Sequence, residues 1–312
     1  MPDRESCVKK DIACVIGLSR REVRVKVDGR DPSRFRSAAT GRESDERTVP
    51  ARFLTVLALA CAFLPVARAA ERPEPPKPTS RTARNIEGWT VRVDDRLLKS
   101  PNDALGTRAL KLLEAKLAEI KSVVAADRLA KLQTVRIVLD LTHGKLHLMQ
   151  YHPDAGWLKA NGYALDLAKC AHIPEAADLV NPRTSNEQPW CVMHELAHAY
   201  HDQVFGFNDP RIRKAYERFK ESGHGNSVLN ISGNRRRHYA LTDQMEFFAE
   251  MTEAYFGMND FFPFNRAELK TAEPEVFELL REIWGPVAER PEAGKARSQP
   301  GSAPGGASSR PA

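Results

Sequence analysis

The chain has 312 residues, of which 42% are apolar and 28% are charged. This length allows at most two domains of ordinary size, and the composition is that of a globular protein. The sequence has no apolar run of about eighteen residues or more, which excludes a multi-pass membrane protein. The net charge of +6 is concentrated at the start, since residues 1–70 hold 14 Lys and Arg against 9 Asp and Glu. The rest of the chain is close to neutral, so we expect no nucleic-acid partner.

Residues 49–70 have the order of a signal peptide. Arg52 precedes an apolar run at residues 53–66, and small alanines follow at the usual positions before a cleavage site. We therefore predict an exported protein, periplasmic or extracellular, that meets a membrane only transiently through this segment. If residues 53–66 stay uncleaved, they would instead anchor the chain. Residues 1–48 are Arg-rich, and we expect them to be disordered or to precede the true start of the protein.

The remaining chain divides into three parts. Residues 71–86 are a Pro-rich linker, residues 87–287 are long enough for one well-buried domain, and residues 288–312 form a Gly/Ser/Pro-rich tail that we expect to be disordered. After export, the chain retains Cys170 and Cys191. These two residues are equally compatible with a disulfide and with two free thiols.

The domain begins with strands and helices in alternation. Apolar residues at alternate positions, or in a short continuous run, predict strands, and apolar residues three and four apart predict helices. Predicted strands cover residues 88–98, 135–139 and 145–151, the last two pairing together. One long helix, or two, covers residues 104–132, and residues 153–187 show no clear period.

Helices dominate the second half of the domain. They are predicted at residues 187–204, 210–220, 242–256 and 266–283. Residues 228–239 read as a hairpin around Ser232-Gly233-Asn234. The order of elements predicts an α+β fold with a small mixed sheet.

The sequence His194-Glu195-Leu196-Ala197-His198 indicates a metal site. Positions i and i+4 of a helix lie one turn apart on one face, so both imidazoles can bind one Zn²⁺. Glu195 lies beside them and can accept a proton from the attacking water. The alternative is a helix with two ordinary histidines.

A catalytic zinc site needs a third protein ligand and keeps one position open. The predicted helix at residues 242–256 places Glu246, Glu250 and Glu253 on one face. We predict Glu246 as the third ligand, and we expect Glu250, one turn on, to hydrogen-bond a ligand histidine. A solvated acidic face is the alternative interpretation.

His201 cannot join His194 and His198 at one zinc, because positions i and i+7 of a helix lie about 10 Å apart. We expect His201 to support the site or to lie at the surface. The other histidines have no ligand spacing, and we interpret them as ordinary residues: His143, His147, His152, His172, His224 and His238.

The sequence HELAHAYHD, followed 48 residues after His198 by Glu246 in MEFFAE, resembles the anthrax lethal factor-type metallopeptidases. The resemblance covers residues 188–258 and implies a zincin-like catalytic domain with Zn²⁺ and a protein or peptide substrate. It implies that Glu246 is the third zinc ligand and that Tyr239, seven residues earlier, assists at the oxyanion. Glu250 matches the second glutamate of the family motif. The family's glycine before the second histidine is Ala197 here, and the chain has no room for the toxin's other domains.

Together, the motif and the resemblance predict an exported zinc metallopeptidase with Glu195 as general base. We expect the strand near residues 145–151 to be the sheet edge that holds the substrate. One alternative is a cell-wall amide hydrolase. Another is a non-catalytic, zinc-stabilised binding domain derived from a protease, although such a domain would have no chemical need for Glu195 or Tyr239.

Overall fold

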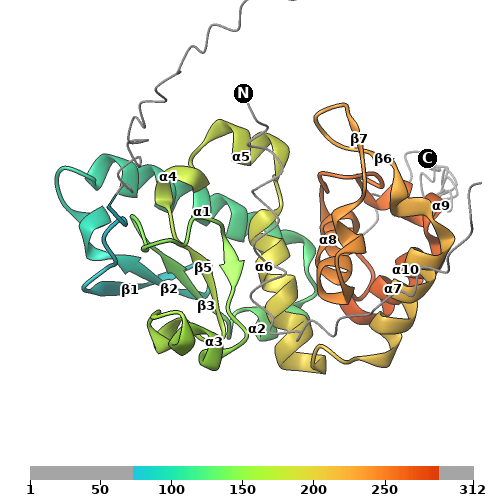
Figure 1. Ribbon diagram of the computed structural model, residues 1–312, viewed down its shortest axis with the longest axis horizontal. Helices are drawn as coiled ribbons and strands as arrows, with labels where there is room; N and C mark the ends of the chain where they lie inside the picture. Colours follow the sequence, from blue (N-terminus) through green and yellow to red (C-terminus); the bar gives the residue numbers. More distant parts are fainter. Residues whose placement is uncertain (1–72, 288–312) are drawn as a thin grey trace, which may run out of the picture. The chain divides into compact units, whose positions relative to one another are not determined.

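The computed structural model describes residues 73–287 (Figure 1). The predictions for residues 1–48, for the signal segment at 49–70 and for the tail at 288–312 lie outside the described residues. Within residues 73–287, no helix is long and apolar enough to cross a membrane.

A five-stranded mixed sheet has the strand order β1-β2-β3-β5-β4. Its strands, in that order, are Arg81–Ile86, Trp89–Asp94, Arg136–Leu139, Cys170–Ile173 and Gln150–Tyr151. Strands β2, β3 and β5 are parallel, while β1 and β4 run antiparallel to their neighbours at the two edges. The small mixed sheet, together with the helices described below, confirms the α+β class.

The sheet differs from the sequence prediction at both edges. Residues 81–86, which composition assigns to the linker, form β1 and pair with β2. Strand β4 pairs with β5 rather than with β3. Strand β5 lies in the segment without a clear period, because all four of its residues are buried and no alternation marks it. Predicted strand 88–98 is shorter than expected, since β2 ends at Asp94 and Asp95–Leu98 form a 3-10 turn.

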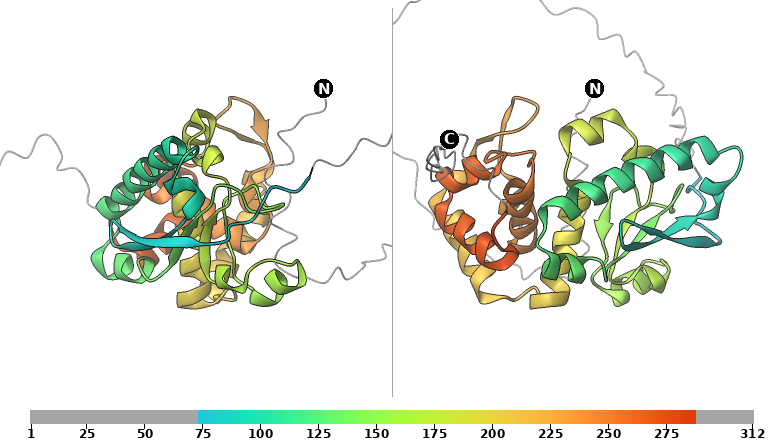
Figure 2. Two further views of the ribbon diagram at one scale, coloured as in Figure 1. Left: turned by 90° about the vertical axis from the view of Figure 1, so that its left-hand side faces the viewer. Right: turned by 180° about the vertical axis from the view of Figure 1, so that it is seen from behind.

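Helices cover both faces of the sheet. The predicted helical segment at 104–132 is two helices, α1 (Asp103–Val123) and α2 (Ala126–Leu132). Figure 2 shows α1 crossing the sheet in the view from behind, and its buried leucines join the main core. On the other face, α3 (Ala155–Ala160) contributes Leu158 to a smaller apolar cluster with Val138 and Cys170.

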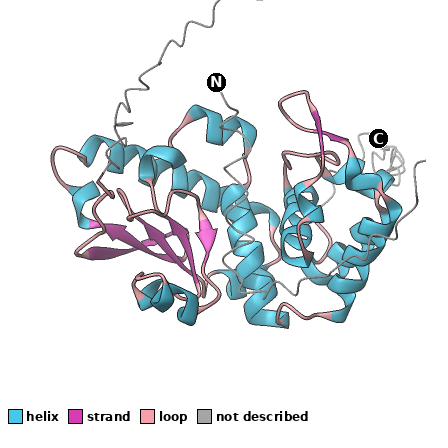
Figure 3. Ribbon diagram, viewed as in Figure 1, coloured by secondary structure: helices cyan, strands magenta, loops and turns pink. Residues whose placement is uncertain are grey.

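Helix α6 (Cys191–Tyr200) lies between the sheet and the C-terminal helices (Figure 1). It packs against β4 and β5 on one side and against α8 (Gln244–Phe256) on the other. Two short helices precede it, α4 (Ala176–Leu179) and α5 (Pro182–Glu187), and a π-helical turn, His201–Phe205, follows it. Figure 3 shows the sheet on one side of α6 and mainly helices on the other.

The remaining helices pack around α8. They are α7 (Pro210–Ser222), α9 (Arg266–Ala272) and α10 (Pro274–Trp284). The single helix predicted at 266–283 is therefore two helices, with Pro274 at the first position of the second, where its missing N–H is not needed. The predicted hairpin forms from β6 (Val228–Leu229) and β7 (Arg235–Arg236).

Helices α6 and α8 run antiparallel and in close contact. Trp190, just before α6, lies against Gly257, just after α8, so closely that a Cβ at Gly257 would meet the indole at 1.8 Å. At the other end of α8, Asp243 caps the helix by accepting hydrogen bonds from the backbone N–H groups of Met245 and Glu246 at 2.8 and 3.0 Å. This pairing places the N-terminal half of α8 beside the histidines of α6.

Candidate metal centre

His194 and His198 of α6 meet Glu246 of α8. The three side chains are buried, and their potential ligand atoms all lie within 4.8 Å of one another. Glu246 Oε2 lies 3.0 Å from His194 Nε2 and 3.4 Å from His198 Nε2. One carboxylate oxygen therefore faces both ring nitrogens, as expected of ligands that share one ion.

The residues present fit a zinc ion. His198 Nε2 is buried, and its 3.4 Å approach to Glu246 Oε2 does not make a hydrogen bond, so the atom has no hydrogen-bond partner within the described residues. Leaving a buried polar atom unpaired costs free energy, and a cation held between the three side chains would remove that cost. Two imidazoles and one carboxylate are also a common ligand set of catalytic zinc sites.

A second carboxylate, from Glu253, supports the His194 ring. Glu253 Oε1 lies 2.6 Å from His194 Nδ1, whereas Glu250 Oε1 is 3.9 Å from that nitrogen. The supporting hydrogen bond expected from Glu250 is thus made by Glu253. The other Glu250 oxygen lies 3.7 Å from His238 Nδ1. Because Glu253 lies seven residues, about two turns, after Glu246, it presents its carboxylate on the same side of α8.

The acidic residues of α8 do not form a solvated face. Glu246, Glu250 and Glu253 are exposed by only 1%, 0% and 4%. Burial raises the pKa of Glu246, but His198 and His194 outweigh this effect and hold that pKa well below its usual range. Burial lowers the pKa of His194, and hydrogen bonds to Glu246 and Glu253 raise it well above the ordinary value. This concentration of buried negative charge favours a cation.

Glu195 is held by the edge strand of the sheet. Its Oε2 accepts a 2.7 Å hydrogen bond from the backbone N–H of Tyr151 in β4. Burial raises the pKa of the Glu195 carboxyl above its ordinary value, against the opposing effect of His194 and His198. A raised pKa suits a general base that must later give its proton away. No sequence signal indicates the contact with Tyr151, because it depends on how β4 docks beside α6.

Tyr239 lies on a 3-10 turn at the edge of the site. Its hydroxyl donates to Glu246 Oε1 at 3.3 Å. Burial, followed by the nearby carboxylates of Glu246 and Glu250, raises the pKa of Tyr239 far above its ordinary value. The hydroxyl therefore keeps its proton and remains a hydrogen-bond donor.

His201 is fully buried rather than at the surface. Its ring contacts the rings of Phe207 and Phe248, with centroid distances of 5.2 and 5.1 Å. Burial lowers the pKa of His201 to about 3, so the ring is neutral. Cys170 and Cys191 are free thiols, which agrees with the second of the two alternatives for them.

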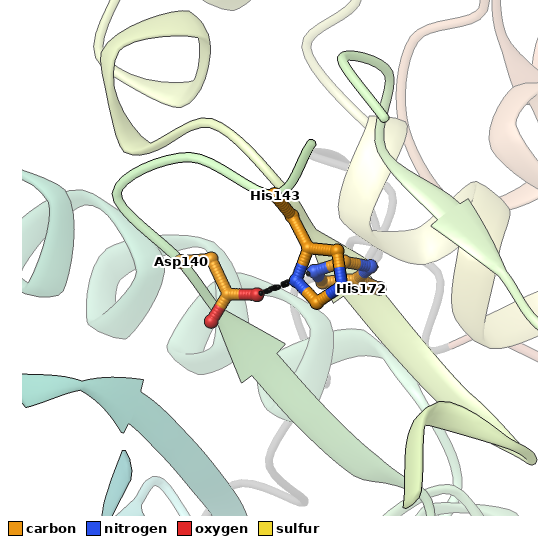
Figure 4. Close-up of side chains that lie close together, drawn as sticks. All are labelled: Asp140, His143 and His172. Atoms are coloured by element: carbon orange, nitrogen blue, oxygen red, sulfur yellow. Dashed lines mark hydrogen bonds and ion pairs between the residues drawn. The ribbon is translucent and has the colours of Figure 1, made fainter. Parts of the chain in front are cut away.

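Three histidines without ligand spacing also come together. His143, His152 and His172 are buried near Asp140, and Figure 4 shows three of these four side chains, Asp140, His143 and His172. They are therefore not isolated ordinary residues. The spacing carries no signal for this group, because its members come from β5 and from the segments that follow β3 and β4.

Comparison of the chain with protein-family models, with curated proteins and with solved structures found no match. The likeness to lethal factor-type metallopeptidases therefore depends on the motif residues of the segment 188–258.

Proposed function

We propose that this protein is an exported zinc metallopeptidase with a zincin-like catalytic domain. The observation that carries the proposal is the buried meeting of His194, His198 and Glu246, with ligand atoms within 4.8 Å of one another. Glu195 lies on the same helix, between the two histidines, as the mechanism requires. The motif resemblance to lethal factor-type enzymes supports a protein or peptide substrate.

Bound zinc would polarise the scissile carbonyl and make water a better nucleophile. Glu195 accepts the proton of the attacking water and returns it to the leaving amine. Tyr239 donates a hydrogen bond to the carbonyl oxygen as negative charge develops there. Glu253 keeps the His194 ring oriented through Nδ1, so that Nε2 faces Glu246.

Zinc content and turnover should be measured together on the purified protein. The Glu195→Gln variant removes the base but leaves the three ligands, and Glu221→Gln, on the exposed face of α7, is the matched control. We expect about one zinc per chain in all three proteins. We expect cleavage of a peptide library by the wild type and the control only.

Each other result points to a different conclusion. No zinc in the wild type would refute the metal site. Zinc without turnover on peptides or cell-wall fragments would favour a zinc-stabilised binding domain. Turnover on cell-wall amides but not on peptides would favour the amide hydrolase. Substantial activity of Glu195→Gln would refute Glu195 as the base.

A further inference from the structure

A buried polar network lies on the face of the sheet opposite α6. Within β5, Ala171 and Ile173 join the main core together with α6, so Cys170 and His172 point to the other face. His172 Nε2 lies 2.9 Å from Asp140 Oδ2, and His172 Nδ1 lies 3.0 Å from His152 Nε2. The exposure of Asp140, His152 and His172 is at most 1%.

Asp140 is saturated with donors. Arg81 donates to both of its oxygens, with Nε 2.7 Å from Oδ1 and Nη2 2.8 Å from Oδ2. His143 Nδ1 lies 2.7 Å from Oδ2 (Figure 4). Burial raises the pKa of Asp140, but these partners outweigh it and hold the pKa far below its usual range. Asp140 is therefore an ionised acceptor paired with a guanidinium.

Asp140, His143 and His172 are close enough to be metal ligands. The position of Arg81 argues against a metal there. Its guanidinium already neutralises the Asp140 carboxylate, and its Nη2 lies 3.3 Å from His143 Nδ1. A divalent cation would leave excess positive charge buried in this cluster. The centre at His194 differs from this cluster, because several buried carboxylates surround its candidate ligands.

The proton positions in the network follow from Asp140. Burial lowers the pKa of His172, and it lowers that of His152 to about 2, so both rings are neutral. Asp140 only accepts, so His172 carries its proton on Nε2 and accepts at Nδ1. His152 must then donate from Nε2. The chain of donors runs from His152 through His172 to Asp140.

His152 directly follows β4, a strand of only two residues. The strand pairs with β5 through Gln150 and Tyr151, and the backbone N–H of His152 donates to the Cys170 carbonyl at 3.1 Å. So short an edge strand has few backbone bonds to hold it in place. The side-chain bond from His152 to His172 adds a buried attachment next to Tyr151, whose N–H holds Glu195.

We propose that the buried chain of Arg81, Asp140, His172 and His152 positions strand β4 and, through the Tyr151 N–H, the carboxylate of Glu195. These are positioning residues, since none of them contacts the candidate ligands. The proposal rests on the proposed function for its effect on turnover. Its effect on the Tyr151 amide does not depend on that function.

Two polar variants of His152 form a matched pair. In His152→Gln the side-chain amide nitrogen is as many bonds from Cβ as His152 Nε2, so it can still donate to His172. In His152→Asn the amide nitrogen is one bond nearer to Cβ, at the position of His152 Nδ1, and so cannot reach His172. His152 Nδ1 itself has no hydrogen-bond partner within the described residues. His143→Gln is the control, because His143 contacts the same Asp140 but lies in the loop after β3.

Three quantities should be measured on each protein: hydrogen exchange at the Tyr151 amide, zinc content with the absorption spectrum of the cobalt-substituted protein, and kcat with KM on a cleaved peptide. For His152→Asn we expect exchange at Tyr151 to be about tenfold faster, with unchanged metal content and spectrum. We expect kcat to fall about tenfold with little change in KM, because Glu195 is misplaced. His152→Gln and His143→Gln should resemble the wild type in exchange and kcat.

Three results would overturn the proposal. The first is exchange at Tyr151 that is the same in His152→Asn as in the wild type. The second is equal acceleration at amides throughout the sheet, which would show a merely structural role. The third is a second zinc that is lost in Asp140→Asn, which would make the cluster a metal site. A protein without peptidase activity but with the expected exchange pattern would refute the proposed function alone.

Discussion

Glu253, rather than Glu250, hydrogen-bonds the His194 ring, so the same substitution at these two glutamates should lower zinc affinity by different amounts. Glu253→Gln keeps the shape of the side chain and an acceptor oxygen for His194 Nδ1, but it removes the charge. Hydrogen bonds to charged groups contribute about 1.5–3 kcal/mol, against about 0.5–1.5 kcal/mol for neutral pairs. The midpoints of these two ranges differ by about 1.3 kcal/mol, which corresponds to roughly a tenfold loss of zinc affinity.

Glu250→Gln is the matched control for this experiment. It removes the same charge from the same helix, but Glu250 Oε1 is 3.9 Å from His194 Nδ1 rather than 2.6 Å for Glu253 Oε1. Zinc affinity should be measured by competition with a chelator at pH 7.5. We expect Glu253→Gln to bind zinc about tenfold more weakly than Glu250→Gln. Equal affinities, or weaker binding by Glu250→Gln, would refute the assignment of Glu253 as the support of His194.

Tyr239→Phe should keep its zinc and lower kcat on peptides by about 10²–10³-fold, because one donor to the oxyanion is lost; an unchanged kcat would show that the ring only packs. Gly257→Ala should destabilise the protein by about 1–3 kcal/mol in urea unfolding, since its Cβ would lie 1.8 Å from the Trp190 ring. An unchanged midpoint would contradict that close approach. The pKa of His201 is lowered from 6.5 to about 3 in the fold, so the unfolded chain binds more protons and stability falls as pH drops below about 6.5. Between pH 7 and pH 5 we expect the wild type to lose about 2 kcal/mol more than His201→Leu in urea unfolding, and equal losses would contradict this.

The helices of the site could be predicted because their signals are local. The motif at 194–198 and the acidic residues at 246–253 lie on helices in the structure, and Asp243 caps the second of them as its side chain allows. The ends of the helices are predicted less accurately: the segment expected to be helical at 187–204 is α-helical only over Cys191–Tyr200. Local pattern indicates that a helix exists, while its ends depend on what the neighbouring chain packs against.

The sheet could be predicted only in part. Strand β5 is buried on both faces, so it has no alternation, and β1 is mostly exposed within a segment rich in proline and charge. The pairing partners of the strands also could not be predicted. A strand of two residues such as β4 carries too little pattern to specify its neighbour, and its place beside β5 follows from long-range packing.

The sequence by itself determined which residues can share a helical face, because the backbone hydrogen bonds of a helix set the spacing of His194 and His198. The tertiary structure decided everything that depends on how separate elements cross. The antiparallel contact of α6 and α8 brings Glu253, rather than Glu250, against the His194 ring. The docking of β4 beside α6 gives Glu195 its partner at Tyr151. Such contacts join residues far apart in the chain, so the orientation of packed elements, which no local pattern encodes, is what selects them.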